Sequence, residues 1–208
     1  MNAGLFITLE GIEGVGKSTH AEFVRDLLEQ NGHHVTLTRE PGGTAAGEAI
    51  RDLLLNHHER QLSDETELLL IFSARAQHLQ EVVRPALSRN ELVICDRFTD
   101  ATYAYQGGGR GIGYDRISVL ERWVQAGLKP DFTLLFDAPV ATGLARAERR
   151  GAADRFESET IPFFEKVRSA YLDIAAMEPD RVHVIDASQS LQKVQQAIRS
   201  LLQRKKLC

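Results

Sequence analysis

The stretch LFITLEGIEGVGKS, from Leu5 to Ser18, decides the fold of this 208-residue chain. Its first five residues are apolar or β-branched, which is typical of a buried strand. Gly11 to Ser18 then satisfies the pattern GxxxxGK[ST], and residues 17–30 carry apolar side chains at helical spacing. A strand, a glycine-rich loop and a helix in this order predict a cradle for phosphate groups.

The chemistry of this loop indicates a nucleoside triphosphate and Mg²⁺. Glycines let successive backbone N–H groups turn inward, and the helix N-terminus adds partial positive charge. The Lys17 ammonium reaches the β- and γ-phosphates, and the Ser18 hydroxyl is a Mg²⁺ ligand. The residues expected to bind the triphosphate are Gly11, Ile12, Glu13, Gly14, Val15, Gly16, Lys17 and Ser18.

A second metal ligand is expected at the end of another strand. Residues 92–95 form a short apolar run that Asp96 follows directly. An aspartate at such a place holds Mg²⁺ or its water ligands, although a plain strand-end or capping aspartate remains the alternative. Asp137, which follows residues 131–136, is the weaker rival for this role.

The rest of the chain predicts an α/β fold with a five-stranded parallel sheet and helices on both faces. Short apolar runs predict strands, and the longer segments between them have helical spacing, so the strands require crossover connections. The expected strands are residues 5–9, 34–38, 92–95, 131–136 and 182–185. The expected helices are residues 17–30, 44–55, 65–87, 115–126, 140–149, 161–177 and 191–202. No linker divides the chain, so residues 1–208 are expected to form one domain.

Composition and charge exclude several classes of protein. The net charge of −4 argues against a protein that coats nucleic acid, although a local basic patch stays possible. Two cysteines without a CxxC motif exclude a disulfide scaffold. No apolar run is long enough to cross a membrane, and residues 1–10 do not resemble a signal peptide. We therefore expect a cytoplasmic protein with small-molecule partners.

Polar segments follow the strands at one edge of the expected sheet, where ligands bind in open parallel sheets. Arg39 and Arg97 each leave a strand, and a guanidinium is a planar fork suited to phosphate oxygens. A surface ion pair is the alternative for each.

Residues 146–157 carry Arg149, Arg150 and Arg155, and this composition predicts a short arginine-rich lid over the phosphates. This inventory favours a small-molecule kinase over a GTPase, because the chain has no NKxD segment.

Two pairs of residues are candidates for reading an acceptor base. Phe72 and Arg75 lie three apart on an expected helix, so a ring and a guanidinium share one face. Thr102 and Gln106 share a face if their stretch is helical, and Tyr105 is a candidate wall of the sugar or base pocket. Plain core packing is the alternative for each aromatic residue. The run of residues 106–111, QGGGRG, is expected to end any helix there.

Along nearly its whole length the sequence resembles the bacterial thymidylate kinases, which belong to the nucleoside monophosphate kinase type of P-loop NTPase. The resemblance rests on LEGIEGVGKST at residues 9–19, TREPGGT at 38–44, FSAR at 72–75, DRF at 96–98 and AYQGGGRG at 104–111. It implies transfer of the ATP γ-phosphoryl group to dTMP with Mg²⁺, and a homodimer. In relatives the bond that corresponds to Glu40–Pro41 is cis, a state that the residues alone leave open.

The resemblance also implies roles for single residues. Phe72 would stack on thymine, Arg75 would bond its exocyclic oxygen, and Thr102 and Gln106 would position the base. Arg39 and Arg97 would bind the acceptor phosphate. Glu13 would contact the sugar 3′-hydroxyl, and Tyr105 would exclude a 2′-hydroxyl. The implied catalytic residues are Lys17, Arg97, Arg149, Arg150 and Arg155. A kinase for another nucleoside monophosphate and an inactive nucleotide-binding subunit are the alternatives.

Overall fold

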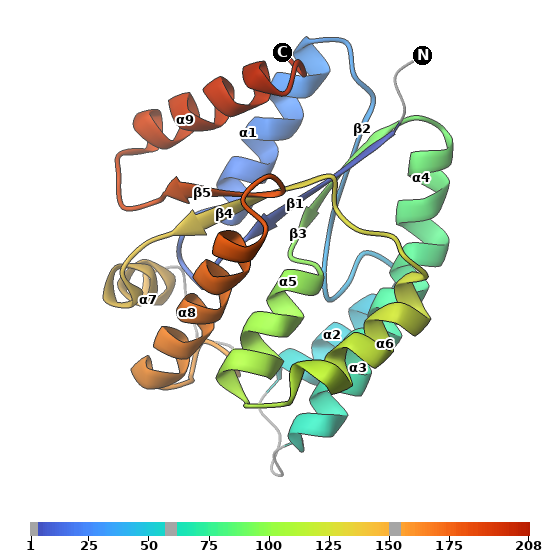
Figure 1. Ribbon diagram of the computed structural model, residues 1–208, viewed down its shortest axis with the longest axis vertical. Coiled ribbons are helices and arrows are strands. Elements are labelled where there is room, and N and C mark those ends of the chain that lie inside the picture. Colours follow the sequence, from blue (N-terminus) through green and yellow to red (C-terminus); the bar gives the residue numbers. More distant parts are fainter. Residues whose placement is uncertain (1–3, 57–61, 150–154) are drawn as a thin grey trace.

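The computed structural model describes residues 4–56, 62–149 and 155–208, and it contains the predicted parallel sheet (Figure 1). The strand order is β2-β3-β1-β4-β5, and all four neighbouring pairs are parallel. The strands are β1 (Leu5–Glu10), β2 (Val35–Arg39), β3 (Leu92–Asp96), β4 (Phe132–Asp137) and β5 (Val182–Asp186). Each of the five extends one residue beyond its predicted carboxyl end. The predicted fold class is confirmed.

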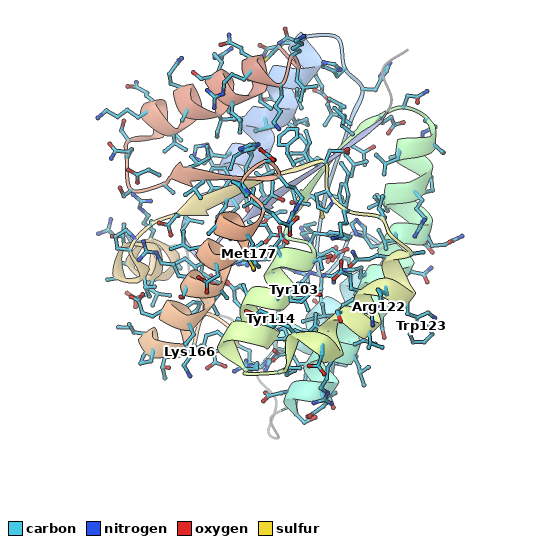
Figure 2. All side chains as sticks on the ribbon, in the orientation of Figure 1. Tyr103, Tyr114, Arg122, Trp123, Lys166 and Met177 are labelled. Carbon is cyan, nitrogen blue, oxygen red and sulfur yellow. The ribbon has the colours of Figure 1, made fainter. Side chains whose placement is uncertain are left out.

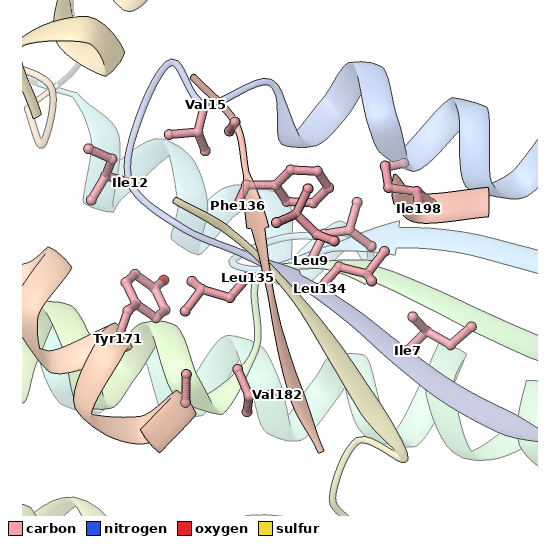
Figure 3. Packing of buried hydrophobic residues seen from close by; sticks show 14 of the residues in the cluster. Ile7, Leu9, Ile12, Val15, Leu134, Leu135, Phe136, Tyr171, Val182 and Ile198 are labelled. Atoms are coloured by element: carbon pink, nitrogen blue, oxygen red, sulfur yellow. The ribbon is translucent and has the colours of Figure 1, made fainter. Parts of the chain in front are cut away.

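The glycine-loop strand β1 lies at the centre of the sheet. Ile7 pairs with Ile94 on one side and with Phe132 on the other. Together with side chains from the covering helices, these strands form the main apolar core, part of which is drawn in Figure 3. The edge strand β2 is only half-buried, because it has a neighbour on one side alone. The central position of β1 places the phosphate loop in the middle of the sheet's carboxyl edge.

Helices cover both faces of the sheet (Figure 1). Helices α1 and α9 pack together on one face, and α8 packs on the other. The helical segments are α1 (Lys17–Gln30), α2 (Ala45–Leu55), α3 (Asp64–His78), η1 (Leu79–Val83), α4 (Arg84–Ser88), α5 (Thr99–Thr102), η2 (Tyr103–Gly109), α6 (Tyr114–Gln125), α7 (Val140–Glu148), α8 (Ile161–Met177) and α9 (Leu191–Arg204). None of the helices in the described part of the chain has the length and apolar character needed to span a bilayer.

The segment predicted as one helix over residues 65–87 is helical throughout but not uniform. It runs as α3, a π-helical turn η1 and then α4. Within η1 the backbone hydrogen bonds span five residues instead of four: the Arg84 N–H donates to the Leu79 carbonyl. Pro85 follows directly and has no N–H to donate into a regular α-helical turn, which accounts for the local change of hydrogen-bond pattern.

The helix ends within QGGGRG, as predicted, but only after Gly109, so the first four residues of the run are helical. The helix that begins at Thr99 continues as η2 through Gly109. The glycines are there because η2 lies against α8: a Cβ on Gly108 would stand 2.7 Å from the Ala170 Cβ, and one on Gly109 would stand 2.5 Å from the Phe163 ring. Tertiary packing on α8 therefore outweighs the low helix propensity of these residues.

This close packing makes Gly108 intolerant of a side chain. We expect Gly108→Ala to lower the free energy of unfolding by about 1–3 kcal/mol, because its methyl group would overpack the contact with α8. Chemical denaturation at equilibrium measures this loss. The matched control is Gly111→Asn, at a position with φ of +80° and open space around its Cβ, where Asn is tolerated. Equal stability losses for the two variants would contradict the packing argument.

Candidate active site

A cavity of about 350 Å³ opens at the carboxyl edge of the sheet. The strand register explains its position, because Leu9 and Arg39 both pair with Asp96, so β1, β2 and β3 end at the same level. The lining includes residues from the glycine loop, from the ends of β2 and β3, from α2 and α3, and from η2 and α7. The predicted convergence of distant segments on one site is observed.

The glycine loop lines one side of this cavity. Its turn uses left-handed backbone at Gly14 (φ 70°) and Gly16 (φ 89°), after which α1 begins at Lys17. Lys17 is buried, and its ammonium donates to the carbonyls of Gly11 (2.9 Å) and Ile12 (2.8 Å). Burial lowers the pKa of Lys17 to about 8. The loop thus holds its only lysine against its own backbone, facing the space that phosphates would take.

Ser18 and Asp96 meet beside the loop. The Ser18 hydroxyl donates to the Asp96 carboxylate over 3.1 Å, and both residues line the cavity. The rival carboxylate, Asp137, is engaged elsewhere, because Arg168 donates to both of its oxygens at 2.7 and 2.9 Å. Ser18 and Asp96, the two side chains predicted as Mg²⁺ ligands, are therefore within hydrogen-bond distance of each other.

Glu13, Arg97 and Tyr105 line the cavity and are bonded to one another. Arg97 donates to a Glu13 carboxylate oxygen at 2.8 Å, and the Tyr105 hydroxyl donates to the other at 2.6 Å. Arg97 adopts a left-handed backbone conformation (φ 71°), and its guanidinium also reaches the Gly11 carbonyl. The unusual backbone angle turns this side chain back over the loop instead of along the strand.

A buried acid lies behind this group. Glu10, the last residue of β1, accepts from the Phe98 N–H (2.7 Å) and from the Tyr171 hydroxyl (2.8 Å). Burial, and next the nearby Asp100 carboxylate, raise the pKa of Glu10 to about 8. The Tyr171 hydroxyl also accepts from Arg97 at 3.4 Å. Sequence reasoning assigned a role to neither residue. Glu10 lies in the quoted motif at residues 9–19, whereas α8 brings Tyr171 to the site from a segment without a recognisable motif.

Arg75 lines the cavity from α3. Its side chain is only 1% exposed. Its Nε donates to Glu40 at 2.7 Å, and one terminal nitrogen donates to Thr102 Oγ1 at 2.9 Å and to the Phe98 carbonyl at 3.1 Å. Its other terminal nitrogen, Nη1, is a buried donor without a hydrogen-bond partner in the described chain. The Glu40–Pro41 peptide bond is cis.

Phe72 does not lie among the described residues that line the cavity. It packs with Leu68, Ile112 and Ile117, and the Arg75 guanidinium stands 4.8 Å from its ring. The residue of α3 that lines the cavity beside Arg75 is Ile71. Both positions satisfy helical spacing to Arg75, being four and three residues away, so spacing alone does not separate them.

Gln106 and Arg155 meet at a carboxylate that the motifs did not reveal, Glu67 on α3. Gln106 donates to Glu67 over 2.8 Å, and Arg155 donates to it over 2.6 Å. Arg155 also donates to the Leu54 carbonyl at the end of α2. The structure thus bonds Arg155 to α2 and α3, and Arg155 is not among the described residues that line the cavity.

The remaining predicted residues lie at the rim of the cavity or outside it. Arg39 lines the cavity, but its half-exposed side chain pairs with Glu48 at 2.9 Å. Arg149 is exposed at the end of α7, and Arg150 lies outside the described residues. Arg146 was read only as part of the lid, yet it lines the cavity and donates to the Ala187 carbonyl over 2.8 Å.

Comparisons with known proteins agree with this geometry. A sequence model of the family described as thymidylate kinase matches residues 9–198. The chain is similar to the thymidylate kinase of Pseudomonas fluorescens (strain SBW25), with 59% identity over 199 residues, 96% of this chain and 95% of the relative. The thymidylate kinase of Pseudomonas putida (strain GB-1) is 58% identical over 200 residues, again 96% of this chain and 95% of the relative.

A solved structure gives the same result. The crystal structure of thymidylate kinase from Ehrlichia chaffeensis superimposes with a TM-score of 0.79 at 32% sequence identity, covering 96% of this chain and 99% of that one. The match includes the sheet and the helices that carry the cavity. With a family model spanning most of the sequence and relatives near 58% identity, this chain belongs to the thymidylate kinase family.

Proposed function

We propose that the cavity at the sheet edge is where this enzyme transfers the γ-phosphoryl group of ATP to dTMP. Phosphorylation of dTMP to dTDP with ATP is the activity of the family to which the chain belongs. The observation that supports the acceptor half of the site is the unpartnered Nη1 of Arg75, a buried donor in a residue that lines the cavity. Such a donor costs about 1–3 kcal/mol unless a ligand accepts from it.

The acceptor base would lie beside Arg75, Ile71 and Gln106. Arg75 is held rigidly by Glu40 and Thr102, so Nη1 offers its hydrogen to an exocyclic oxygen of the base without further reorganisation. Ile71 offers an apolar surface to one face of the base. Glu13 and Tyr105 stand next to each other where the deoxyribose would lie, consistent with recognition of a 3′-hydroxyl and exclusion of a 2′-hydroxyl.

The triphosphate would occupy the glycine loop. Lys17 faces the loop, and the Ser18–Asp96 pair supplies the oxygen ligands that Mg²⁺ prefers. The described residues contain no cluster of three or more His, Cys, Asp or Glu side chains around a common point, so an ion here would complete its shell with phosphate oxygens and water. When bound there, Mg²⁺ would supply positive charge that offsets the negative charge of the phosphates.

Arginines would stabilise the transferred group. Arg97 projects between the loop and the acceptor pocket, and Arg39 lies at the rim on the acceptor side. The lid, residues about 146–157, begins in the last turn of α7. Helix α7 packs directly on the loop, because a Cβ on Gly14 would overlap the Gly143 carbonyl. Arg149 ends this helix and is the lid arginine that we assign to transition-state charge.

We also propose that two copies of the chain associate through α3 and α6. These neighbouring helices expose apolar side chains that a monomer leaves in water: Leu69 is 54% exposed, Val119 55% and Trp123 79% (Figure 2 labels Trp123). Clustered exposed apolar residues mark interaction surfaces. A cytoplasmic location is consistent with the two free thiols, Cys95 and Cys208.

An acceptor panel tests the function. ADP release from Mg-ATP is measured with dTMP, dUMP, UMP, dCMP, AMP, GMP or no acceptor. We expect dTMP to be preferred, with dUMP lower in kcat/KM by no more than about 200-fold, because one methyl group in an apolar contact contributes only about 1–3 kcal/mol. Preference for another acceptor, or ADP release without an acceptor, would contradict the assignment.

If Arg149 in the lid stabilises the transition state, its removal should lower kcat. Arg149→Ala is expected to lower kcat by about 100-fold or more while changing the dTMP KM much less, because a lid arginine acts on charge that develops in the transition state. Steady-state kinetics measure both constants. Arg25→Ala, at an exposed ion pair on α1, is the control. Unchanged kcat in Arg149→Ala, in Arg150→Ala and in the double variant would remove the lid arginines from catalysis.

The association surface is tested by analytical ultracentrifugation. The wild type is expected to sediment at twice the mass of one chain, and Trp123→Glu to shift the equilibrium toward single chains, because a carboxylate would be buried at the contact. Met177→Glu, at a 68% exposed residue of α8, is the matched control and should leave the mass unchanged (Figure 2). A wild type of single-chain mass would refute the proposal.

A further inference from the structure

Glu67 is a charged residue in an unusual position. It lies on α3, two helical turns before Arg75, and its side chain is 1% exposed. Two guanidiniums bond it: Arg110 reaches both carboxylate oxygens at 3.2–3.3 Å, and Arg155 reaches Oε2 at 2.6 Å. A buried carboxylate is stable only when it is paired and hydrogen-bonded, and these two arginines meet that requirement.

A third donor to Glu67 is the base-pocket residue Gln106. Its side-chain nitrogen donates to Glu67 Oε1 over 2.8 Å, and Gln106 is itself 1% exposed. An ionised carboxylate only accepts hydrogen bonds, whereas an amide carries a donor on one branch and an acceptor on the other. Glu67 therefore admits one orientation of the Gln106 amide, in which the NH₂ faces Glu67 and the carbonyl oxygen is left for another partner.

The pocket then has a defined pattern of donors and acceptors. Arg75 supplies a donor through Nη1, and Gln106 supplies an acceptor through its carbonyl oxygen. Thr102 lies four residues before Gln106 on the same helical segment, and its hydroxyl oxygen accepts from Arg75. A pyrimidine with a 4-oxo group and an N3–H matches this pattern. Cytosine does not, because its 4-amino group is a donor and its N3 is an acceptor.

We propose that Glu67 is a specificity-determining positioning residue: it fixes the amide of Gln106 as an acceptor and thereby excludes a 4-aminopyrimidine nucleotide from the acceptor pocket. This inference rests on the proposed acceptor site. Glu67 acts through Gln106, and Arg110 and Arg155 keep it in place. Arg110 is itself anchored by Glu159 and by the Phe163 ring, whose centroid is 4.7 Å away.

The variant Glu67→Gln tests the proposal. It keeps the shape of the side chain but carries its own donor, so Gln106 is no longer held in one orientation. We expect the ratio of kcat/KM for dTMP to that for dCMP to fall by about tenfold or more, since polar groups left unpaired by the wrong base underlie such discrimination. Glu67→Asp, which still only accepts, should keep the ratio close to the wild-type value even if both activities fall.

The control is Glu65→Gln, two residues away on the same helix, at an exposed ion pair with Arg116. It should leave the ratio unchanged. A merely structural role for Glu67 would lower kcat/KM for dTMP and dCMP together, so an unchanged ratio in folded Glu67→Gln would overturn the proposal. A wild type that does not phosphorylate dTMP would instead refute the proposed function.

A measurement on the wild type covers the case in which Glu67→Gln does not fold. Neutron diffraction from crystals exchanged into D₂O locates the deuterons on the Gln106 amide directly. We expect both on the branch that faces Glu67. Deuterons on the opposite branch would overturn the proposal without reference to any variant.

Discussion

Two arginines, one buried and one partly buried, are each paired with a carboxylate and organise the cavity of this member of the thymidylate kinase family. Arg75 is held by Glu40 at 2.7 Å, and Arg97 by Glu13 at 2.8 Å. Taking an ion out of water costs several kcal/mol, and only a well-placed partner offsets that cost, so neither member of such a pair tolerates loss of the other. Each carboxylate thus fixes the direction of one guanidinium. Because the partners come from different strand ends and helices, the sheet must be complete before the site exists.

The ion pairs occupy most of the hydrogen-bonding groups of these side chains, and the few polar groups left over belong to residues that line the cavity. Arg75 donates three hydrogen bonds to protein atoms through Nε and Nη2, and its Nη1 remains a buried donor group without a partner in the described chain. Glu67 accepts from the Gln106 amide, so the proposed acceptor pocket has fixed polar groups before any nucleotide enters. Pre-arranged dipoles of this kind need no reorganisation at the moment of reaction, which is the usual basis of electrostatic catalysis and of specificity among similar bases.

Close backbone packing fixes the glycine loop and η2, which both line the cavity, against neighbouring helices. The glycine loop touches α7 at Gly14 and Gly143, and η2 approaches α8 through Gly108 and Gly109 at distances that admit no side chain. The loop that carries Lys17 and the helical segment that carries Gln106 are therefore both fixed against neighbouring helices. The glycines of the AYQGGGRG segment serve helix packing, which explains why the helix continues to Gly109 despite their low helix propensity.

The sequence by itself determined the strand–loop–helix unit at Leu5 to Ser18, the parallel sheet and the alternation of strands and helices, because these follow from local periodicity and from a motif whose backbone geometry is local. It also identified the family, since its motifs are contiguous. Only the tertiary structure decided that Ile71 and not Phe72 lines the cavity, that Arg155 bonds Glu67, and that Glu10 and Tyr171 lie behind Arg97. These contacts join residues far apart in the chain, and their partners depend on how helices pack on the sheet, which spacing along one helix does not encode.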